Sequence, residues 1–327
     1  MKRSLIALAL LLGTVAIGQA FKQERAAGGG EMTASAERFL KGLSPEQRDA
    51  ATMDYDAAQR LEWHFIPKNE RKGLQLRDMN EQQRMLARNL LASCLSEVGF
   101  EKATTIMDLE KILAKLEGDG ARFKRDYLRY YYTVFGTPGQ GKWGLSIEGH
   151  HLSLNFVVAD GKIVAHTPAF FGANPALVMS SAGVGPEKGT RVLAQEELLA
   201  FELVNALTDK QRKSATIADK APAEIRAAGE AQPPQTAPEG IAAKDLTSEQ
   251  KSTLQELIGV YARSMPAKTA EQELSKIEAA GFDKVHFAWA GALKPGVGHY
   301  SRVQGPTFLI EFVNVQPDAA GNPANHI

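Results

Sequence analysis

Residues 148–156 read EGHHLSLNF, in which apolar and polar side chains alternate after a glycine. Side chains on a β-strand point to the two faces of the sheet in turn, so Leu152, Leu154 and Phe156 are predicted to be buried together. The stretch QGPTFLIEF, residues 304–312, repeats this pattern with the same parity. Both stretches are therefore predicted to lie in β-hairpins with one buried face and one polar face.

Each hairpin ends a similar series of predicted elements. An aromatic strand precedes each one, YYTVFG at residues 131–136 and HFAWAG at residues 286–291. Two amphipathic helical segments precede each strand. We therefore predict an α+β fold made of two similar helix-helix-β-hairpin units, a degenerate internal duplication that shares a mixed or antiparallel sheet. A chance likeness between two amphipathic hairpins is the alternative.

Four predicted helices begin with the same capping pattern, in which a Ser, Thr or Asn is followed three residues later by Gln. Each side chain of such a pair can bond to a backbone N–H group of the other residue. The pattern begins at Ser44, Asn80, Thr208 and Thr247. We interpret these residues as helix starts and assign them no role in chemistry.

The single cysteine, Cys94, belongs to an apolar series with Leu86, Leu90 and Val98 at helical spacing. This spacing predicts a thiol buried in the core, which is more typical of a small apolar residue than of a nucleophile. One cysteine also makes neither an intramolecular disulfide nor a multi-thiolate zinc site. Any metal site in this chain would therefore use histidines and carboxylates.

The chain has 327 residues, with 38 basic and 38 acidic side chains, and 44% of it is hydrophobic. This composition is typical of a globular protein, and the balanced charge argues against a nucleic-acid-binding surface. Residues 1–20 have the pattern of a secretory signal peptide, with Lys2 and Arg3 before an apolar run and a small residue at Ala20. The apolar run is shorter than the roughly 20 residues that cross a bilayer. We therefore predict cleavage before Phe21, a secreted or periplasmic location and no stable membrane span, with an uncleaved anchor as the alternative.

Composition also suggests how the rest of the chain is divided. Residues 21–36 are predicted to be a flexible leader, and residues 221–244, with a Pro-Pro pair and repeated Ala and Glu, a linker. The linker would separate an N-terminal part, residues 37–220, from a C-terminal part, residues 245–327.

Histidines and acidic residues gather in the hairpin motifs. Imidazole and carboxylate groups are the usual ligands of zinc, copper or iron where thiolates are absent. The candidate metal ligands are His150, His151, His299 and His326, and the candidate catalytic residues are Glu148, Arg302 and Glu311. Neighbouring histidines on a strand point apart, so His150 and His151 would share one ion only if the backbone bulged at Gly149. Hydrogen bonding of these imidazoles across a polar sheet is the alternative.

Amide and aromatic side chains near these histidines suit a small polar molecule, such as a sugar or a peptide fragment. The candidate substrate-binding residues are Asn155, Phe171, Asn174 and Gln304. Residues 167–176 are rich in Pro and Gly, and we expect this loop either to cover the polar face as a lid or to plug the seam between the two units.

The chain has no HExxH helix, no GxSxG elbow and no phosphate-binding loop. Two classes of function therefore stay open. The first is an exported metal-dependent enzyme, hydrolytic or oxidative, that uses the paired hairpins. The second is a non-catalytic module that binds a sugar or a peptide, and a structural protein of the envelope is a further alternative.

Five stretches of the chain together resemble the DUF3500 family. They are WHFIP at residues 63–67, EGHHLSLN at 148–155, TPAFFGANPA at 167–176, HYSRVQGPTFLIE at 299–311 and NHI at 325–327. The resemblance covers nearly all of the chain after the leader. It implies membership of a family without an established activity, so it assigns no role to any residue. The family's members usually continue past the NHI stretch with further His, Trp, Arg and Asp residues, a departure that bears on any role of His326.

Overall fold

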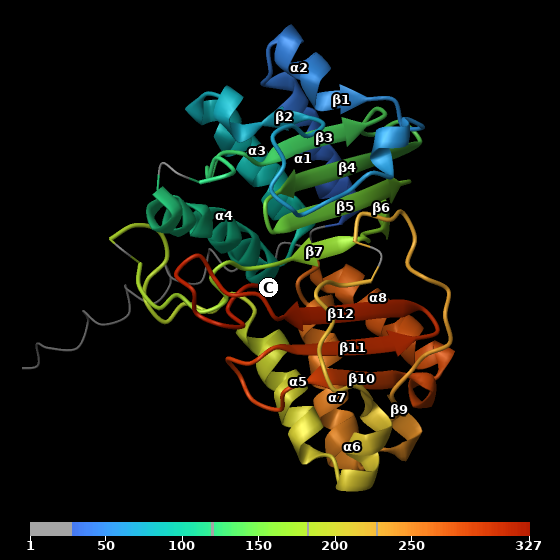
Figure 1. Ribbon diagram of the computed structural model, residues 1–327. Coiled ribbons are helices and arrows are strands. Elements are labelled where there is room, and N and C mark those ends of the chain that lie inside the picture. The colour runs from blue at the N-terminus through green and yellow to red at the C-terminus, as the bar shows by residue number, and fades with distance from the viewer. Residues whose placement is uncertain (1–27, 119–120, 182, 227) are drawn as a thin grey trace, which may run out of the picture.

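The computed structural model of the protein describes residues 28–118, 121–181, 183–226 and 228–327 (Figure 1). The predicted signal peptide and the start of the leader lie outside the described residues. Eight α-helices and two mixed β-sheets, of seven and five strands, form this part of the chain and confirm the predicted α+β class. Within the same ranges, no helix combines the length and the apolar character that crossing a membrane requires.

The first sheet occupies the upper part of the view in Figure 1. Its strands are β1 (Thr52–Met53), β2 (Leu74–Gln75), β3 (Tyr131–Phe135), β4 (Lys142–Gly149), β5 (Leu152–Ala159), β6 (Lys162–Ala165) and β7 (Ala169–Phe171). The main order is β1-β3-β4-β5-β6, while β2 pairs with β3 and β7 pairs with β5. Only β1 is parallel to its neighbour.

The second sheet lies below the first in the same view (Figure 1). Its strands are β8 (Thr216–Ala218), β9 (Ile241–Ala242), β10 (His286–Gly291), β11 (His299–Gly305) and β12 (Phe308–Asn314). The main order is β12-β11-β10-β8, while β9 also pairs with β10. As in the first sheet, one short strand is parallel to its neighbour: β8 is parallel to β10, and the other pairs are antiparallel. The prediction of one shared sheet is therefore wrong, because the two hairpins lie in separate sheets. Strand β7 pairs with β5, and no strand ladder joins β7 to β12.

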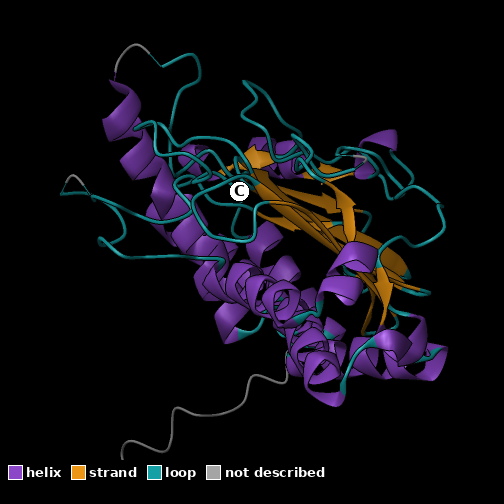
Figure 2. Ribbon diagram, turned by 60° about the horizontal axis from the view of Figure 1, so that its bottom comes forward, coloured by secondary structure: helices purple, strands orange, loops and turns teal. Residues whose placement is uncertain are grey.

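The helices gather along one side of the strands (Figure 2). They are α1 (Gly29–Lys41), α2 (Pro45–Ala51), α3 (Glu81–Cys94), α4 (Glu97–Glu117), α5 (Ala194–Ala206), α6 (Asp209–Ala215), α7 (Ser248–Ala262) and α8 (Ala267–Ala280). Short 3₁₀ turns lie at Ala58–Arg60, Leu76–Asp78, Ala243–Asp245 and Phe282–Lys284. We call the first sheet with α1 to α4 the first half, and the second sheet with α5 to α8 the second half. Helix α1 packs on α3 in the first half, and α5 packs on α7 in the second.

The apolar core lies between the helices and the sheets and has the predicted strand parity. Leu152, Leu154 and Phe156 are buried in the core of the first half. In the second half, Phe312 is buried, while Phe308 and Ile310 are half-buried and pack against a core that contains Trp289. Burying one large apolar side chain contributes about 1.5 to 3 kcal/mol, so these faces hold the helices to the strands.

All four predicted capping pairs are present at the starts of α2, α3, α6 and α7. The capping glutamines also bond to each other. The Nε2 atom of Gln83 donates to Oε1 of Gln47 at 2.7 Å, and Nε2 of Gln211 donates to Oε1 of Gln250 at 2.8 Å. Each pair therefore ties the start of one helix to the start of another.

Cys94 is fully buried at the end of α3, as its helical spacing predicts. Its Sγ atom lies 3.0 Å from the carbonyl oxygen of Leu90. Burial raises the pKa of the thiol to about 12. The residue is therefore an unreactive part of the core.

Helix α1 occupies residues that were expected to belong to a flexible leader. Met32, Ala36 and Phe39 recur at helical spacing on this helix, and all three are fully buried. The Ala- and Gly-rich composition concealed this apolar stripe, which packs on the core of the first half.

Candidate functional site

Three histidine rings lie against one another beside the C-terminal end of the chain, which Figure 1 shows between the two sheets. His150 and His151 form the turn between β4 and β5, and their ring centroids are 4.0 Å apart. The ring of His326 lies 4.8 Å from that of His151, edge to face. We call His150, His151 and His326 the imidazole cluster.

Two glycines make room for this turn. A side chain at Gly149 would begin 2.2 Å from the ring of Tyr130, whose hydroxyl donates to the carbonyl oxygen of His150 at 2.9 Å. A side chain at Gly172 would begin 2.7 Å from Nδ1 of His151. His151 itself has a φ of 60°, which a residue other than glycine adopts only where its surroundings hold it there.

Glu110 lies next to the cluster, with its Oε1 atom 2.5 Å from Nδ1 of His150. This glutamate belongs to α4 and is 4% exposed. Burial raises the pKa of Glu110 to about 7, although Arg125 opposes that shift. Burial, followed by the charge of Arg125, holds the pKa of His150 well below its usual value. The pair therefore has a carboxyl group that titrates near neutral pH beside a neutral imidazole.

Arg125 brings a positive charge to this pair. Its Nη1 atom lies 3.3 Å from Nδ1 of His150. The same guanidinium donates to both carboxylate oxygens of Glu117, at 2.7 and 2.8 Å. This fork-to-fork contact fixes the plane of the guanidinium beside the imidazole.

A narrow cleft reaches Glu110 and His150 from the surface. Its basic lining residues are Lys68, Arg71, Lys124, Arg125 and Arg129. The cleft has a cavity volume of about 20 Å³, which is the room that one water molecule needs. The Nη2 atom of Arg129 donates to the carbonyl oxygens of Lys68 and Asn69, at 3.2 and 2.5 Å. Carbonyl oxygens do not neutralise a guanidinium, so the cleft has a positive rim.

The inner side of the cluster carries unpartnered polar atoms. His151 is 5% exposed, and neither of its ring nitrogens has a hydrogen-bond partner in the described part of the chain. Burial, with the neighbouring His150 and His326, holds the pKa of His151 well below its usual value, and the backbone of Ile327 only partly opposes this. Asn174 has its Nδ2 atom 3.4 Å from Nδ1 of His326, and its Oδ1 atom also lacks a partner.

His299 lies in a separate pair, with Nε2 3.0 Å from Oε1 of Glu197. Its ring stacks on Trp289 at an interplanar angle of 9°. Asn314 connects this pair to the imidazole cluster, because its Nδ2 atom donates to Glu197 at 3.0 Å and its Oδ1 atom accepts the backbone N–H of His326 at 3.1 Å. A metal site shared between His299 and His150 or His151 would require these histidines to lie together. The structure does not bring them together, because Glu197 and Asn314 connect His299 to the cluster.

Across the described ranges, no group of three or more His, Cys, Asp or Glu side chains is arranged to hold a metal ion. In the cluster, the rings pack against one another and do not aim three nitrogens at one point. The bulge expected at Gly149 is absent, because His150 and His151 form a two-residue turn after the regular pairing of Gly149 with Leu152.

Among the described residues, Glu148, a candidate catalytic residue, has two cations and a hydroxyl group as its side-chain partners. Its Oε1 atom accepts from Nζ of Lys72 at 2.6 Å and from the hydroxyl of Ser146 at 3.0 Å, and Nη1 of Arg71 is 3.6 Å from Oε2. These cations belong to residues 54–73, which we call the first cover segment. Glu148 therefore ties this segment to the first sheet.

Three polar residues of the second sheet, Arg302, Gln304 and Glu311, also have their partners in a segment that covers the sheet. Arg302 pairs with Glu239, with Nη2 and Oε2 2.6 Å apart, and Oε1 of Glu311 lies 3.2 Å from Nε of Arg226. The Nε2 atom of Gln304 donates to the carbonyl oxygen of Thr236 at 2.9 Å. These partners belong to residues 219–240, the second cover segment, which includes most of the predicted linker.

Asn155 and Phe171 contribute to packing around β7. The Nδ2 atom of Asn155 donates to the carbonyl oxygen of Pro168 at 3.0 Å, and Phe171 packs against the core of the first half. Just beyond β7, Ala173 and Ile327 exchange backbone hydrogen bonds of 2.8 and 2.9 Å. The 167–176 loop therefore joins the C-terminal segment beside the cluster, where it supplies Gly172 and Asn174.

Glu110, Arg125, Glu197 and Asn314 did not stand out in the sequence. Glu110 did leave a signal, because it lies between Leu109 and Ile112 on the buried face of α4. A charged residue at a buried helical position needs a partner, and such a position often marks a functional group. Nothing local points to Arg125 or Asn314, whose partners are distant in sequence.

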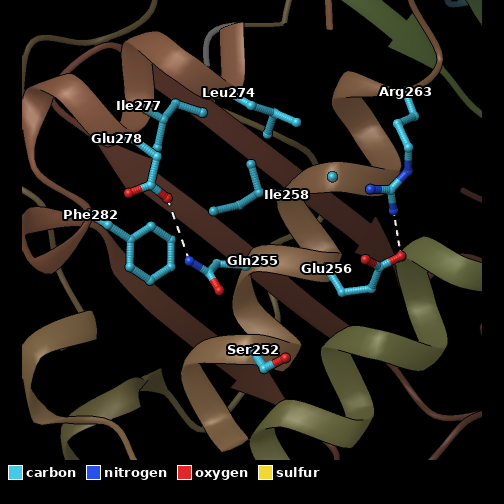
Figure 3. Close-up of a pocket in the computed structure, with 10 residues that line it drawn as sticks. Ser252, Gln255, Glu256, Ile258, Arg263, Leu274, Ile277, Glu278 and Phe282 are labelled. Atoms are coloured by element: carbon cyan, nitrogen blue, oxygen red, sulfur yellow. Dashed lines mark hydrogen bonds and ion pairs between the residues drawn. The ribbon is translucent and has the colours of Figure 1, made fainter. Parts of the chain in front are cut away.

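A larger groove, of about 450 Å³, lies between α7 and α8 (Figure 3). Ile258, Leu274, Ile277 and Phe282 give it an apolar floor. Its polar lining residues pair among themselves, since Arg263 contacts Glu256 and Gln255 donates to Glu278. The groove has neither a histidine nor a cysteine in its lining, so the basic cleft is the better candidate for chemistry.

Comparison with known proteins identifies the family of the chain but assigns it no activity. No curated protein and no solved structure matches the chain. A family model described as a protein of unknown function matches residues 26–327, so the chain belongs to the DUF3500 family.

Proposed function

We propose that the protein is an enzyme that performs general acid–base chemistry, of the hydrolytic kind, on a small anionic substrate. The observation that carries the proposal is the 2.5 Å contact between Glu110 and His150 at the inner end of a cleft with basic walls. Buried pairs of titratable groups with shifted pKa values, placed in a cleft, are characteristic of catalytic sites.

The proposed step moves one proton. With its Nδ1–H directed at the Glu110 carboxylate, His150 has a bare Nε2 atom, which takes a proton from a water molecule as that water attacks the substrate. The imidazolium ring is then stabilised by the carboxylate, and it returns the proton to the leaving group. Because the pKa of Glu110 is raised to about 7, the carboxylate that this step requires is present at and above neutral pH.

The substrate class follows from the charge of the cleft. Among the described residues, the side chain of Arg129 has hydrogen bonds to carbonyl oxygens only, and Lys68 and Lys124 are exposed at the rim. Such a rim attracts a carboxylate or a phosphate and lowers the free energy of negative charge that develops during the reaction. A binding protein that uses the same cleft without turnover is the competing outcome of the test.

A metal-dependent form of this chemistry would require the rings of His151 and His326 to turn toward His150. Elemental analysis of the purified protein, after it has been loaded with zinc, copper or iron, tests that form directly. The proton-transfer proposal is tested separately, because it predicts turnover in the presence of a chelator.

The central test is hydrolysis of chromogenic anionic esters, p-nitrophenyl phosphate and the mono-p-nitrophenyl ester of succinate. We expect Glu110→Gln and His150→Gln each to lower turnover by about 100-fold or more, a typical effect of removing a general acid or base. His166→Gln is the matched control, because His166 also lies near a carboxylate, 3.5 Å from Glu273, but away from the cleft. Binding without turnover would point to the binding protein, and equal activity of all variants would refute the proposal.

We also infer that the two halves are copies of one unit. Both contain two helices, a short parallel strand, a second short strand, two more helices and three antiparallel strands in this order. Matching side-chain contacts support the inference: the Nε2 atom of Gln47 donates to the carbonyl oxygen of Asp78 at 2.7 Å, and that of Gln211 donates to the carbonyl oxygen of Asp245 at 3.0 Å. Chance likeness of two hairpins does not account for such contacts outside the hairpins.

A further inference from the structure

We propose a second ligand site, beneath the second cover segment, for a small carboxylic acid with a neighbouring hydroxyl group. This site is built on Arg302, Gln304 and Arg226, and it does not depend on the function proposed for the imidazole cluster. It lies on the face of the second sheet opposite the helices, because Val303, between Arg302 and Gln304, faces the core.

Arg302 is a buried cation with incomplete partners. Its side chain is 3% exposed, and its carboxylate partner, Glu239, is 61% exposed. The Nε atom of Arg302 is buried and has no hydrogen-bond partner among the described residues. A guanidinium stays charged when buried, so an exposed carboxylate and one orphan N–H group leave it poorly compensated.

Two further unpartnered atoms border the same segment. The Oε1 atom of Gln304 and the Nη2 atom of Arg226 are buried without partners in the described structure. Both side chains contact Thr236, since Gln304 donates to its carbonyl oxygen and Nη1 of Arg226 donates to its hydroxyl at 3.2 Å. Together with Nε of Arg302, whose guanidinium contacts Glu239, two unpartnered donors and one unpartnered acceptor therefore border residues 236–239 of the cover segment.

This set of atoms defines the chemistry of a ligand. A carboxylate accepts from the two guanidinium donors, and a hydroxyl group next to it donates to Oε1 of Gln304. The Oε1 atom of Glu311 accepts from the hydroxyl of Tyr300 at 2.5 Å and from Nε of Arg226 at 3.2 Å, so Glu311 holds Arg226 through a nitrogen other than the unpartnered Nη2. The carboxylate of Glu239 occupies the place at Arg302 that the ligand carboxylate would take.

The cover segment allows this exchange. Its described residues form turns and bends, without a helix or strand between Asp219 and Gly240. Glu239 is largely in solvent, so its side chain can leave Arg302 by rotation alone. Because the carboxylate of this pair stays in solvent, a ligand carboxylate can replace it at the buried guanidinium.

Calorimetric titration with sodium lactate tests the site, in protein that carries His150→Gln so that the imidazole cluster makes no contribution. We expect lactate to bind more tightly than acetate, and methyl lactate, which lacks the carboxylate, not to bind. Glu239→Ala should tighten lactate binding by about fivefold, because it removes the competing carboxylate. Arg302→Lys, which keeps the charge but loses the planar fork, should weaken binding by about tenfold.

The matched control is Glu230→Ala, an exposed residue of the same segment. It should leave the affinity for lactate unchanged, and thermal melting should show that every variant is folded. A purely structural ion pair predicts that Glu239→Ala lowers the melting temperature and does not tighten lactate binding. That result, or equal binding of lactate and acetate, would overturn the proposal.

Discussion

The backbone N–H of His326 donates to Oδ1 of Asn314 at 3.1 Å, and this contact joins the last strand of the second sheet to the imidazole cluster. Asn314 is 1% exposed, and its Nδ2 atom is used at the same time by Glu197. One amide therefore connects Glu197 of α5 to His326 of the imidazole cluster. The arrangement makes Asn314 a positioning residue for His326.

Replacing Asn314 with alanine should lower the free energy of unfolding by about 1 to 3 kcal/mol, because the buried Glu197 carboxylate loses a donor and His326 loses an acceptor. Urea denaturation measures the change. Asn205→Ala is the control, since Asn205 is exposed and makes only a 3.3 Å contact to the carbonyl oxygen of Leu293. Equal effects of the two substitutions would contradict a positioning role for Asn314.

Glu110 should leave a signature in the dependence of stability on pH. Its pKa rises from about 4.5 in the unfolded chain to about 7 in the folded protein. The folded state therefore holds the proton more tightly, and this contribution to stability is complete below pH 4.5 and disappears as the pH rises through 7.

In Glu110→Gln that contribution is absent. Relative to the variant, the wild type should lose roughly 2 to 4 kcal/mol of stability between pH 4.5 and 7. Denaturation curves at several pH values provide the measurement. The buried histidines act in the opposite direction and are present in both proteins. Parallel stability curves for the two proteins would show that folding does not raise the pKa of Glu110.

Gly172→Ala tests the space around His151. The new methyl group would begin 2.7 Å from Nδ1 of His151 and 2.6 Å from the carbonyl oxygen of Ile327. Crowding of this kind typically costs about 1 to 3 kcal/mol. We also expect turnover on anionic esters to fall more than tenfold as the cluster is displaced.

Gly30→Ala is the matched control for that substitution. Gly30 lies on α1 with no atom within 4 Å of the new methyl group, and alanine favours a helix by about 0.5 to 1 kcal/mol relative to glycine. The control should therefore melt at the same or a higher temperature and keep full turnover. A Gly172→Ala variant that matches it in both measurements would show that the space beside His151 is not required.

The capping glutamines test whether the halves are equivalent. Gln47→Ala and Gln211→Ala each remove one capping box and one contact to a second helix, so each should cost about 1 kcal/mol. Gln82→Ala, at an exposed position of α3, should be close to neutral. A large effect in one half and none in the other would argue against two copies of one unit.

Export can be checked on the mature chain. We expect protein recovered from outside the cytoplasm to begin at Phe21, and Ala20→Asp to retain the first 20 residues because a charged side chain disfavours cleavage. Intact-mass measurement distinguishes the two forms. Wild-type protein recovered with Met1 as its first residue would contradict cleavage.

Local features of the fold were predictable because they depend on neighbours in the chain. The capping pairs at Ser44 and Thr247, the parity of Leu154 and the burial of Cys94 all follow from spacing. The division into two sheets was not predictable, because strand edges are assigned by contacts between distant segments.

Only part of the candidate site was predictable, because some of its residues lie in local motifs and others come from distant parts of the chain. His150, His151, Asn174 and His326 come together, whereas His299, which was expected to share their site, pairs with Glu197. Their partner Glu110 is 40 residues from His150, and its role depends on how α4 packs. Glu148 and Glu311 have the chemistry of catalytic residues, but their oppositely charged partners lie in cover segments without a recognisable pattern.

The ion pairs beneath the cover segments differ from surface pairs in their response to salt. Lys72 and Glu148 are 8% and 5% exposed, so dissolved ions do not come between them. Added salt weakens attraction between charges in solvent, but it leaves this contact almost unchanged. The first cover segment is therefore held to its sheet by an electrostatic contact whose strength changes little between dilute buffer and concentrated salt.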